Sequence, residues 1–258
     1  MAFTAAPNIT ARATPMWKAT PMETLLQTHA FLSLKEGVLH VKPGEWTVTQ
    51  PIIPPAGIGM IIPAGTTLHF SADSYLYVRG PLQLEGTNEK PVILAGIDDH
   101  AWQGLAVVDA KGMSRWRYAK IFRTDFTRYE GRSALTGGIT FYRSNVDMNH
   151  VRIKGSRAED ALNIIHSHFT LHDVAVSDTL QDAIDSDFST GEIKQSQFEH
   201  VLGDAIDTSG STVKVENSTF TDIGDKALSV GENSNMTARG LVITQAETGI
   251  ASKDASLT

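Results

Sequence analysis

The sequence EDALNI at Glu159–Ile164 decides the fold, because close copies of it return every 22 residues. The copies are QDAIDS at Gln181–Ser186, GDAIDT at Gly203–Thr208 and DKALSV at Asp225–Val230. Aligned on this period, one column is alanine throughout, the next is leucine or isoleucine, and the flanking columns are mostly polar. Three short strands and three turns fill about 22 residues, so each repeat is expected to form one coil of a parallel β-helix, with coils about 4.8 Å apart.

The remainder of the chain supports the same interpretation. From Val38 onward, short β-rich runs such as VLHVKPGEWTV and GMIIPAGTTLHF are separated by Pro-Gly, Ala-Gly and Gly-Thr turns. Upstream, ETLLQTHAFLSL at Glu23–Leu34 has apolar residues at helical spacing, which predicts a short capping helix. A leucine-rich repeat would need spaced leucines and an asparagine ladder, and a helical repeat would need long amphipathic stretches. Neither pattern is present.

Two parts of the sequence resemble the right-handed parallel β-helix superfamily. The run GTTLHF…LYVRGPLQLEGTNEKPVILAG, followed by Trp102–Leu105, is similar to the first coils of bacterial surface β-helix proteins. The run from LTGGITFYRS to GDKALSVGENS resembles a module of large secreted or membrane-attached bacterial proteins. The resemblance covers most of residues 36–258. It implies an all-β, single-stranded right-handed β-helix of about nine coils, preceded by an arm and capping helix at residues 1–35.

Composition excludes several classes of protein. The chain has 258 residues, 41% hydrophobic and 20% charged, as in ordinary soluble domains. Its apolar runs are too short to span a bilayer, no signal peptide is visible, and without cysteine it has neither disulfides nor thiolate metal sites. The net charge of −7 is unevenly distributed: residues 111–157 carry eleven basic and three acidic side chains, whereas residues 158–258 carry five and seventeen. Opposed blocks of charge indicate a polar partner, a metal or mutual contact.

The repeats concentrate acid on one surface. Strand alternation turns Leu162, Ile184, Ile206 and Leu228 inward and the next column, Asn163, Asp185, Asp207 and Ser229, outward. Five aspartates therefore crowd onto two neighbouring coils: Asp182, Asp185, Asp187, Asp204 and Asp207. Two carboxylates about 5 Å apart repel by roughly 0.8 kcal/mol in water and roughly 3 kcal/mol at an effective dielectric constant of 20. A bound cation, a proton or a nearby lysine must relieve this repulsion. Hard oxygen ligands without thiolates favour Ca²⁺ as the metal, and no organic cofactor is expected.

Three functions fit such a surface. By resemblance to β-helix lyases and epimerases, Lys226 or Lys253 would remove a proton from a uronate while the aspartates hold the cation. By resemblance to β-helix glycosidases, Asp185 and Asp207, with Asp187 beside them, would supply acid and base. The third alternative is a structural or adhesive stalk, because aspartate is favoured at turns and a stacked column can be a ladder around a structural ion.

The basic segment at residues 111–157 is the second functional feature. It interleaves arginines and lysines with Trp116, Tyr118, Tyr129 and Tyr142, and residues 111–135 are expected to form an irregular basic insertion. The predicted ligand is an anionic polysaccharide, for example one that contains uronate. The residues predicted to bind it lie near the repeats: Arg143, Arg152, Lys154, Asn163 and His166. The alternative is a solvated surface whose arginine stems cover apolar atoms. No motif indicates nucleic-acid binding.

The last coil ends at Leu257 and Thr258 without a polar cap. An open β-helix end exposes unpaired backbone, so further coils, a partner domain or self-association are expected to cover it. Taken together, the expected function is a secreted or cell-surface module that engages an anionic polysaccharide.

Overall fold

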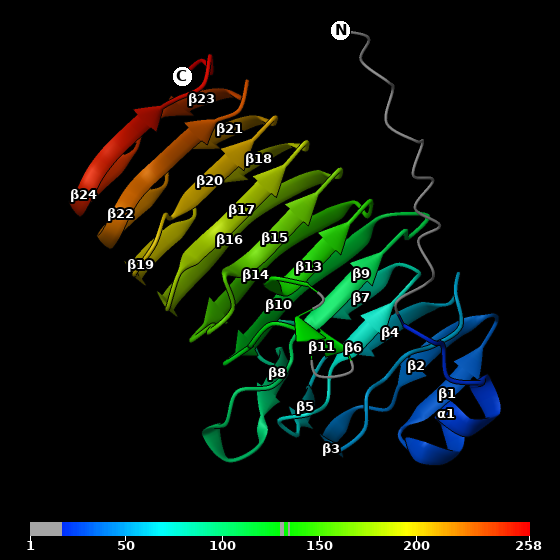
Figure 1. The fold of residues 1–258 in the computed structure, drawn as a ribbon. Coiled ribbons are helices and arrows are strands. Elements are labelled where there is room, and N and C mark those ends of the chain that lie inside the picture. Colours follow the sequence, from blue (N-terminus) through cyan, green and yellow to red (C-terminus); the bar gives the residue numbers. More distant parts are fainter. Residues whose placement is uncertain (1–16, 130–131, 134) are drawn as a thin grey trace, which may run out of the picture.

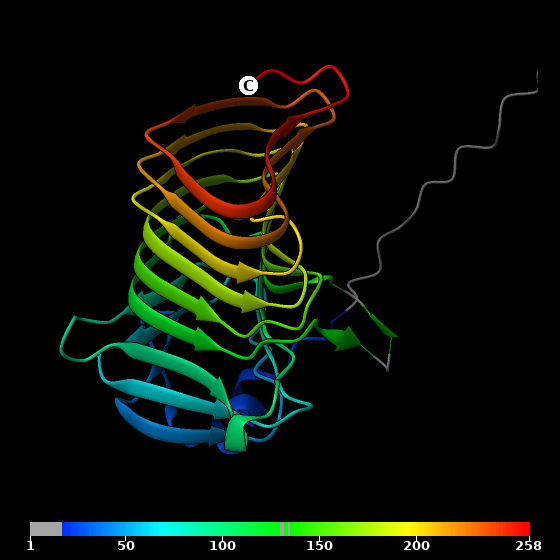
Figure 2. The ribbon, with the colours of Figure 1, turned by 90° about the vertical axis from the view of Figure 1, so that its left-hand side faces the viewer.

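The computed structural model describes residues 17–129, 132–133 and 135–258, and these form a right-handed parallel β-helix of about ten turns (Figure 1). Residues 1–16 of the predicted arm and residues 130, 131 and 134 of the predicted basic insertion lie outside the described residues. Seen side-on, the coils stack one above another (Figure 2). The fold class predicted from the 22-residue period is confirmed.

Three faces run the length of the stack. The strands of the first face pair in parallel from coil to coil. They are β2 (Val38–Val41), β4 (Gly59–Pro63), β7 (Leu82–Glu85), β10 (Ser114–Phe122), β14 (Val146–Lys154), β16 (His168–Thr179), β18 (Thr190–Lys194), β21 (Thr212–Glu216) and β23 (Asn235–Arg239). β10, β14 and β16 bend at the corner and continue into the second face.

The second face contains those continuations together with β3 (Gly44–Val48), β5 (Thr66–Phe70), β8 (Val92–Gly96), β19 (Gln197–Val201), and the first halves of β22 (Thr219–Gly231) and β24 (Val242–Ser252). The third face contains β6 (Leu76–Val78), β9 (Leu105–Val108), β13 (Gly137–Tyr142), β15 (Asp160–Ile165), β17 (Asp182–Asp187), β20 (Ile206–Ser209), and the second halves of β22 and β24. The repeated sequence copies form this third face.

The N-terminal cap is shorter than the sequence predicts. Helix α1 covers Met22–Thr28, and the predicted extension to Leu34 is wrong because Leu32–Lys35 forms β1, which pairs antiparallel with β2. Pairing Leu32 with Val41 satisfies backbone groups that a longer helix would leave exposed above the first coil. Three short elements complete the fold: η1 (Ile97–Asp99), β11 (Arg128–Tyr129) and β12 (Arg132–Ser133).

The interior is a continuous apolar stack. Leu162, Ile184, Ile206 and Leu228 are all buried, as the strand alternation predicts. Aromatic rings also stack between coils: Phe198 lies 4.9 Å from Phe220 with nearly parallel planes. Burying one such side chain contributes about 1.5–3 kcal/mol. The stack leaves little room, since a Cβ added at Gly191 would lie 2.4 Å from the Phe169 ring.

Each corner of the coil is made by a residue in the left-handed backbone region. Between the third and first faces these include Arg143, His166, Phe188 and Gly210, with φ between 48° and 61°. A serine follows each of them, and six serines form a ladder in which the backbone N–H of one donates to the hydroxyl of the next. They are Ser144, Ser167, Ser189, Ser211, Ser234 and Ser256. This ladder satisfies backbone donors that the sharp turn removes from the sheet.

Near its N-terminal end, the outer side of the third face is covered by described residues. Trp17 stacks on Tyr77 at 4.4 Å, and both pack with Ala106 on the outside of β6 and β9. From β15 onward this side carries the acidic columns. At the other end Val242, Ile250 and Leu257 are exposed, and the predicted covering of that end stays a prediction. None of the described helices is long and apolar enough to cross a membrane.

Candidate functional site

The third face places acidic side chains in three adjacent columns. Asp160 pairs with Asp182 across β15 and β17, and Asp185 pairs with Asp207 across β17 and β20. Asp187 continues the β17 strand beyond Asp185. Because the strands are in register, each partner lies one coil spacing of about 4.8 Å from the next. The crowding predicted from the repeats is therefore present in the fold.

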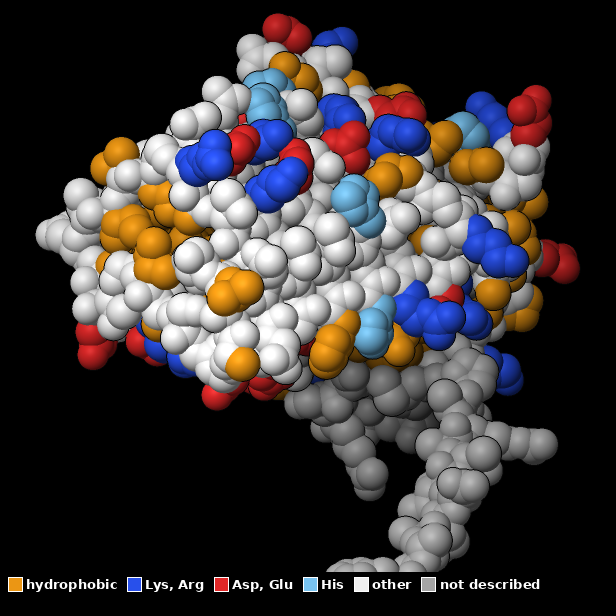
Figure 3. Space-filling model, turned by 90° about the horizontal axis from the view of Figure 1, so that it is seen from above, with side chains coloured by type: hydrophobic (Ala, Val, Ile, Leu, Met, Phe, Trp, Pro, Cys, Tyr) orange, Lys and Arg blue, Asp and Glu red, His pale blue; other side chains and the backbone are white. Residues whose placement is uncertain are grey.

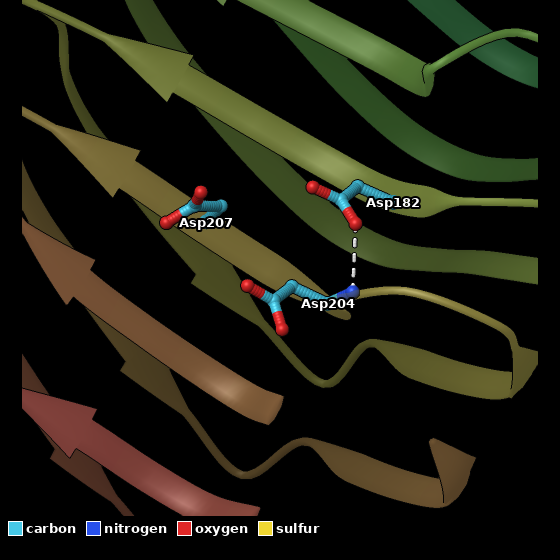
Figure 4. A group of neighbouring side chains, drawn as sticks. All are labelled: Asp182, Asp204 and Asp207. Carbon is cyan, nitrogen blue, oxygen red and sulfur yellow. Dashed lines mark hydrogen bonds between the residues drawn. The ribbon is translucent and has the colours of Figure 1, made fainter. Parts of the chain in front are cut away.

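Three of the five predicted metal ligands meet most closely. One carboxylate oxygen each from Asp182, Asp204 and Asp207 lies within 4.8 Å of the other two. Figure 4 shows these side chains on neighbouring coils, with an oxygen of Asp182 accepting the backbone N–H of Asp204 at 2.7 Å. Two oxygens on opposite sides of one Ca²⁺ are about 5 Å apart, since each Ca–O bond is about 2.5 Å. The spacing fits one such ion.

Asp160 also belongs to this acidic face, although it was not among the site residues predicted from the repeats. It is 4% exposed and accepts a hydrogen bond from Asn163 Nδ2 at 2.7 Å. Asn163 also donates to Asp185 at 3.3 Å, while its Oδ1 atom is buried and has no hydrogen-bond partner in the described part of the chain. The column position of Asp160, shared with Asp182 and Asp204, was the available signal.

Two outward positions are less accessible than strand alternation suggests. Asn163 is 3% exposed and Ser229 is fully buried. Asn163 is enclosed by the carboxyl groups that it binds, so it supports the acidic face from beneath, and a ligand cannot reach most of its side chain. The Ser229 hydroxyl, next to Asp207 across β20 and β22, is also buried, and no described residue forms a hydrogen bond with it.

Burial and mutual repulsion raise the pKa values on this face. Burial raises the pKa of Asp185 to about 8, and the charges of Asp160 and Asp187 add to the shift. Burial raises the pKa of Asp182 to about 7, against the hydrogen bond from the Asp204 backbone, which lowers it. For Asp160 burial raises the pKa to about 6, although the hydrogen bond from Asn163 opposes the shift. The charged form of the face is therefore unfavourable without a counter-ion.

The pKa of Asp187 is also raised, first by burial and then by the charges of Glu232 and Asp207, while His166 opposes the shift. Glu232 was not selected from the sequence. It follows β22 outside the four aligned hexapeptides, so only the fold brings its charge near Asp187.

One lysine partly neutralises the face. Lys226 Nζ lies 3.2 Å from Asp204 Oδ1 and also contacts Asp225. Partial burial lowers the pKa of Lys226, but the hydrogen bonds to Asp225 and Asp204 outweigh it and the net pKa is raised. Lys226 therefore remains protonated at neutral pH. Lys253 stands one coil beyond Gly231 on the exposed surface, two coils from the Asp207 strand.

The predicted polysaccharide contacts separate onto different corners. Arg143 and His166 line one cavity of about 460 Å³ beside Tyr142. Arg152 and Lys154 lie on the second-face half of β14. Each of the three basic side chains forms an ion pair with an aspartate. The pairs are Arg143–Asp109 at 3.3 Å, Arg152–Asp173 at 2.8 Å and Lys154–Asp178 at 3.0 Å.

Carboxylates of the protein itself therefore neutralise these three predicted contacts, and binding of a polysaccharide by the basic segment stays a prediction. Figure 3 shows basic and acidic side chains intermixed along one edge of the molecule, as expected where ion pairs neutralise basic residues. An aromatic ladder borders the acidic face instead. His166 stacks on Phe188 at 5.1 Å and meets Tyr142 edge-on at 6.2 Å, and Phe188 is 58% exposed. The sequence pattern indicated Tyr142 and His166 but not Phe188, which is the corner residue before Ser189 of the serine ladder.

Comparisons with known proteins add little beyond the fold. No family model and no curated protein matches the chain. Among solved structures, a doubly substituted pectate lyase from Xanthomonas campestris is similar over 90% of this chain and 71% of its own, with 11% identity and a TM-score of 0.37. ORF18 of Geobacillus virus E2 is similar over 89% of this chain and 57% of its own, with 9% identity and a TM-score of 0.22. Likeness of this size carries no functional argument.

Proposed function

We propose that the acidic third face binds a divalent cation, best Ca²⁺, and uses it to hold an acidic polysaccharide at a secreted or cell-surface location. The observation that carries the proposal is the convergence of Asp182, Asp204 and Asp207 within 4.8 Å. Beside them lie buried oxygens of Asn163 and Ser229 that have no hydrogen-bond partner among the described residues. Six aspartates share this face and a single lysine contacts one of them. The excess negative charge favours a bound cation, since the described residues supply no further cation to this face.

The same charge explains why the cation would also recruit the ligand. A carboxylated glycan is repelled by ionised aspartates and attracted once a cation lies between the two sets of carboxylates. The exposed ring of Phe188, stacked on His166, offers an apolar surface against which a sugar can pack. This ladder lies along the same edge as Asp187, whose pKa responds to the His166 charge.

Binding fits this geometry better than proton abstraction. A lyase or epimerase needs an uncharged base beside the cation, and Lys226 is held protonated by Asp204 and Asp225. Lys253 lies two coils beyond the Asp207 strand. The polysaccharide function therefore does not depend on either lysine acting as a base.

The test is retention of uronate polymers by the intact chain, with Ca²⁺ and with chelator. Wild type is expected to retain the polymer only with Ca²⁺, and Asp207→Asn is expected to lose retention. The matched control is Asp222→Asn, which removes one carboxylate from an exposed corner on another face. Retention that survives chelation, or that both variants lose equally, would overturn the proposal.

Glycoside hydrolysis is the second candidate, favoured by the pKa of Asp185. A carboxyl group that titrates near 8 stays protonated at neutral pH, as a general acid must. Its register partner Asp207 lies one coil spacing away, near the separation of about 5–5.5 Å found in retaining glycosidases. Release of reducing ends in chelator, abolished by Asp185→Asn, would favour this candidate over cation-dependent binding.

A further inference from the structure

A second cavity lies at the corner between the first and second faces, away from the acidic columns. Its volume is about 320 Å³. The loop at residues 87–91 between β7 and β8 forms one wall, and Tyr118 and Lys120 of β10 with His150 and Arg152 of β14 form the other. The function proposed above makes no use of this cavity.

Positive charge in the cavity exceeds the charge available to balance it. Lys120 and Arg152 are register partners on adjacent parallel strands, so their backbones are about 4.8 Å apart and their side chains leave the same side of the sheet. Asp173 binds Arg152 at 2.8 Å through one carboxylate oxygen and His150 through the other. Within the described part of the chain Lys120 forms no ion pair, so its charge faces the cavity unbalanced.

The remaining donors indicate the shape of the missing anion. Arg152 Nη1 donates to the backbone oxygens of Val151 and Asp173, and Nη2 donates to the Asp173 carboxylate. The paired N–H groups that bind a planar carboxylate are therefore already engaged. On the opposite wall the Thr87 and Asn88 side chains hydrogen-bond Glu89 of the same loop, so among the described lining residues Lys120 keeps the cationic donor that is not already engaged. The Lys120 ammonium is a compact point charge without the paired N–H groups that match a planar carboxylate, so it suits the tetrahedral oxygens of a phosphate or sulfate group.

The cavity is larger than an inorganic anion requires. Its side wall is a ring pair, since Tyr118 stacks on His150 at 4.4 Å with nearly parallel planes. We propose that this cavity binds the phosphate or sulfate ester of a monosaccharide-sized molecule, with the oxyanion beside Lys120 and Arg152 and the remainder along the Tyr118–His150 wall. The site is independent of the acidic face and requires no divalent cation.

The test is calorimetric titration of the full chain, in chelator, with glucose 6-phosphate, galactose 6-sulfate, glucuronate, inorganic phosphate and glucose. The two esters are expected to bind, glucuronate and inorganic phosphate to bind more weakly, and glucose not to bind. Comparison of the two esters shows which tetrahedral group the cavity prefers. Glucuronate binding more tightly than both esters, or binding of glucose, would overturn the assignment.

Two matched variants locate the binding. Lys120→Gln is expected to weaken ester binding about tenfold or more, the effect of losing a hydrogen bond to a charged group. Arg115→Gln removes the same charge from an exposed position on the same strand, outside the cavity, and is expected to leave binding unchanged. Lys120 is exposed, so its substitution should not impair folding, and circular dichroism checks this. Equal affinity of the two variants would refute the site. Asp207→Asn should bind the esters normally, which separates this proposal from the cation site.

Discussion

At the scale of a single residue, the partly buried carboxyl group of Asp185 makes the stability of the protein depend on pH. It lies in a strand whose inward neighbours are fully buried, and its own carboxyl group is enclosed by other acids. The ordinary pKa of 3.8 is raised to about 8. Between these values the folded chain keeps a proton that the unfolded chain releases. The stability contributed by this residue is therefore complete below about pH 4 and is lost as the pH rises to about 8.

Asp185→Asn is expected to raise the melting temperature in chelator at pH 8 and to leave it nearly unchanged at pH 4. The amide has the size of the protonated carboxyl group but cannot ionise, so the pH dependence of unfolding should become flatter. Thermal denaturation followed by circular dichroism from pH 4 to pH 9 measures this. Asp222→Asn, at an exposed corner, is the control and should retain the wild-type pH profile. A variant less stable than wild type at pH 8 would show that the carboxylate has a stabilising partner.

At the scale of an element, the corner of the coil depends on the serine ladder. The Ser189 hydroxyl accepts the backbone N–H of Ser167 at 3.0 Å and lies 2.8 Å from the Asp187 carbonyl, to which it donates. These bonds replace sheet pairing where the left-handed residue Phe188 turns the chain. The ladder therefore holds the corner beside which the aromatic pair His166 and Phe188 stacks.

Ser189→Ala is expected to destabilise the protein by about 1–3 kcal/mol, because it leaves a buried backbone N–H without an acceptor. Chemical denaturation measures the change. Ser177→Ala is the control, since its half-buried hydroxyl forms no hydrogen bond with the described part of the chain. Equal effects from the two substitutions would mean that the ladder adds no stability of its own. Loss of glycan retention in Ser189→Ala, with cation binding intact, would show that the corner positions the aromatic pair.

At the scale of the whole molecule, the β-helix repeats the same local contacts from coil to coil. Each coil packs mainly on its two neighbours, so stability is approximately a sum of such contacts. The same stacking brings side chains 22 residues apart into register and accumulates charge on one face. A cation on that face would add a side-chain link between neighbouring coils that strand pairing already joins.

Calcium is expected to raise the melting temperature more at pH 8 than at pH 5. At pH 5 protons occupy Asp160, Asp182 and Asp185 in the folded state, and a cation must displace them. At pH 8 and a Ca²⁺ concentration 100 times the dissociation constant, the gain is about 2.7 kcal/mol, or roughly 5–10 °C for a chain of this size. Differential scanning calorimetry with Ca²⁺, Mg²⁺ and chelator checks this. A Ca²⁺ effect that is equal at both pH values would contradict a site built from these carboxylates.

The period of 22 residues was enough to predict the β-helix, because a coil needs a set chain length and a buried column needs apolar residues. It was also enough to predict that Asp182, Asp204 and Asp207 lie together, since register follows directly from the repeat. The helix boundary at Thr28 could not be predicted, because Leu32 satisfies a helical pattern and a strand equally well. The ion pairs of Arg143 and Arg152 could not be predicted from the sequence either, because their partners Asp109 and Asp173 lie 34 and 21 residues away along the chain.

The sequence by itself determined the coil, the inward columns and the place where acid collects, because these depend on period and alternation alone. Only the tertiary structure decided how that acid behaves. It buried Asp160 and Asn163, kept Lys226 protonated between two carboxylates, and separated the basic residues onto other corners. The physical reason is that pKa values and ion pairs depend on burial and on distances across coils, which a one-dimensional pattern does not specify.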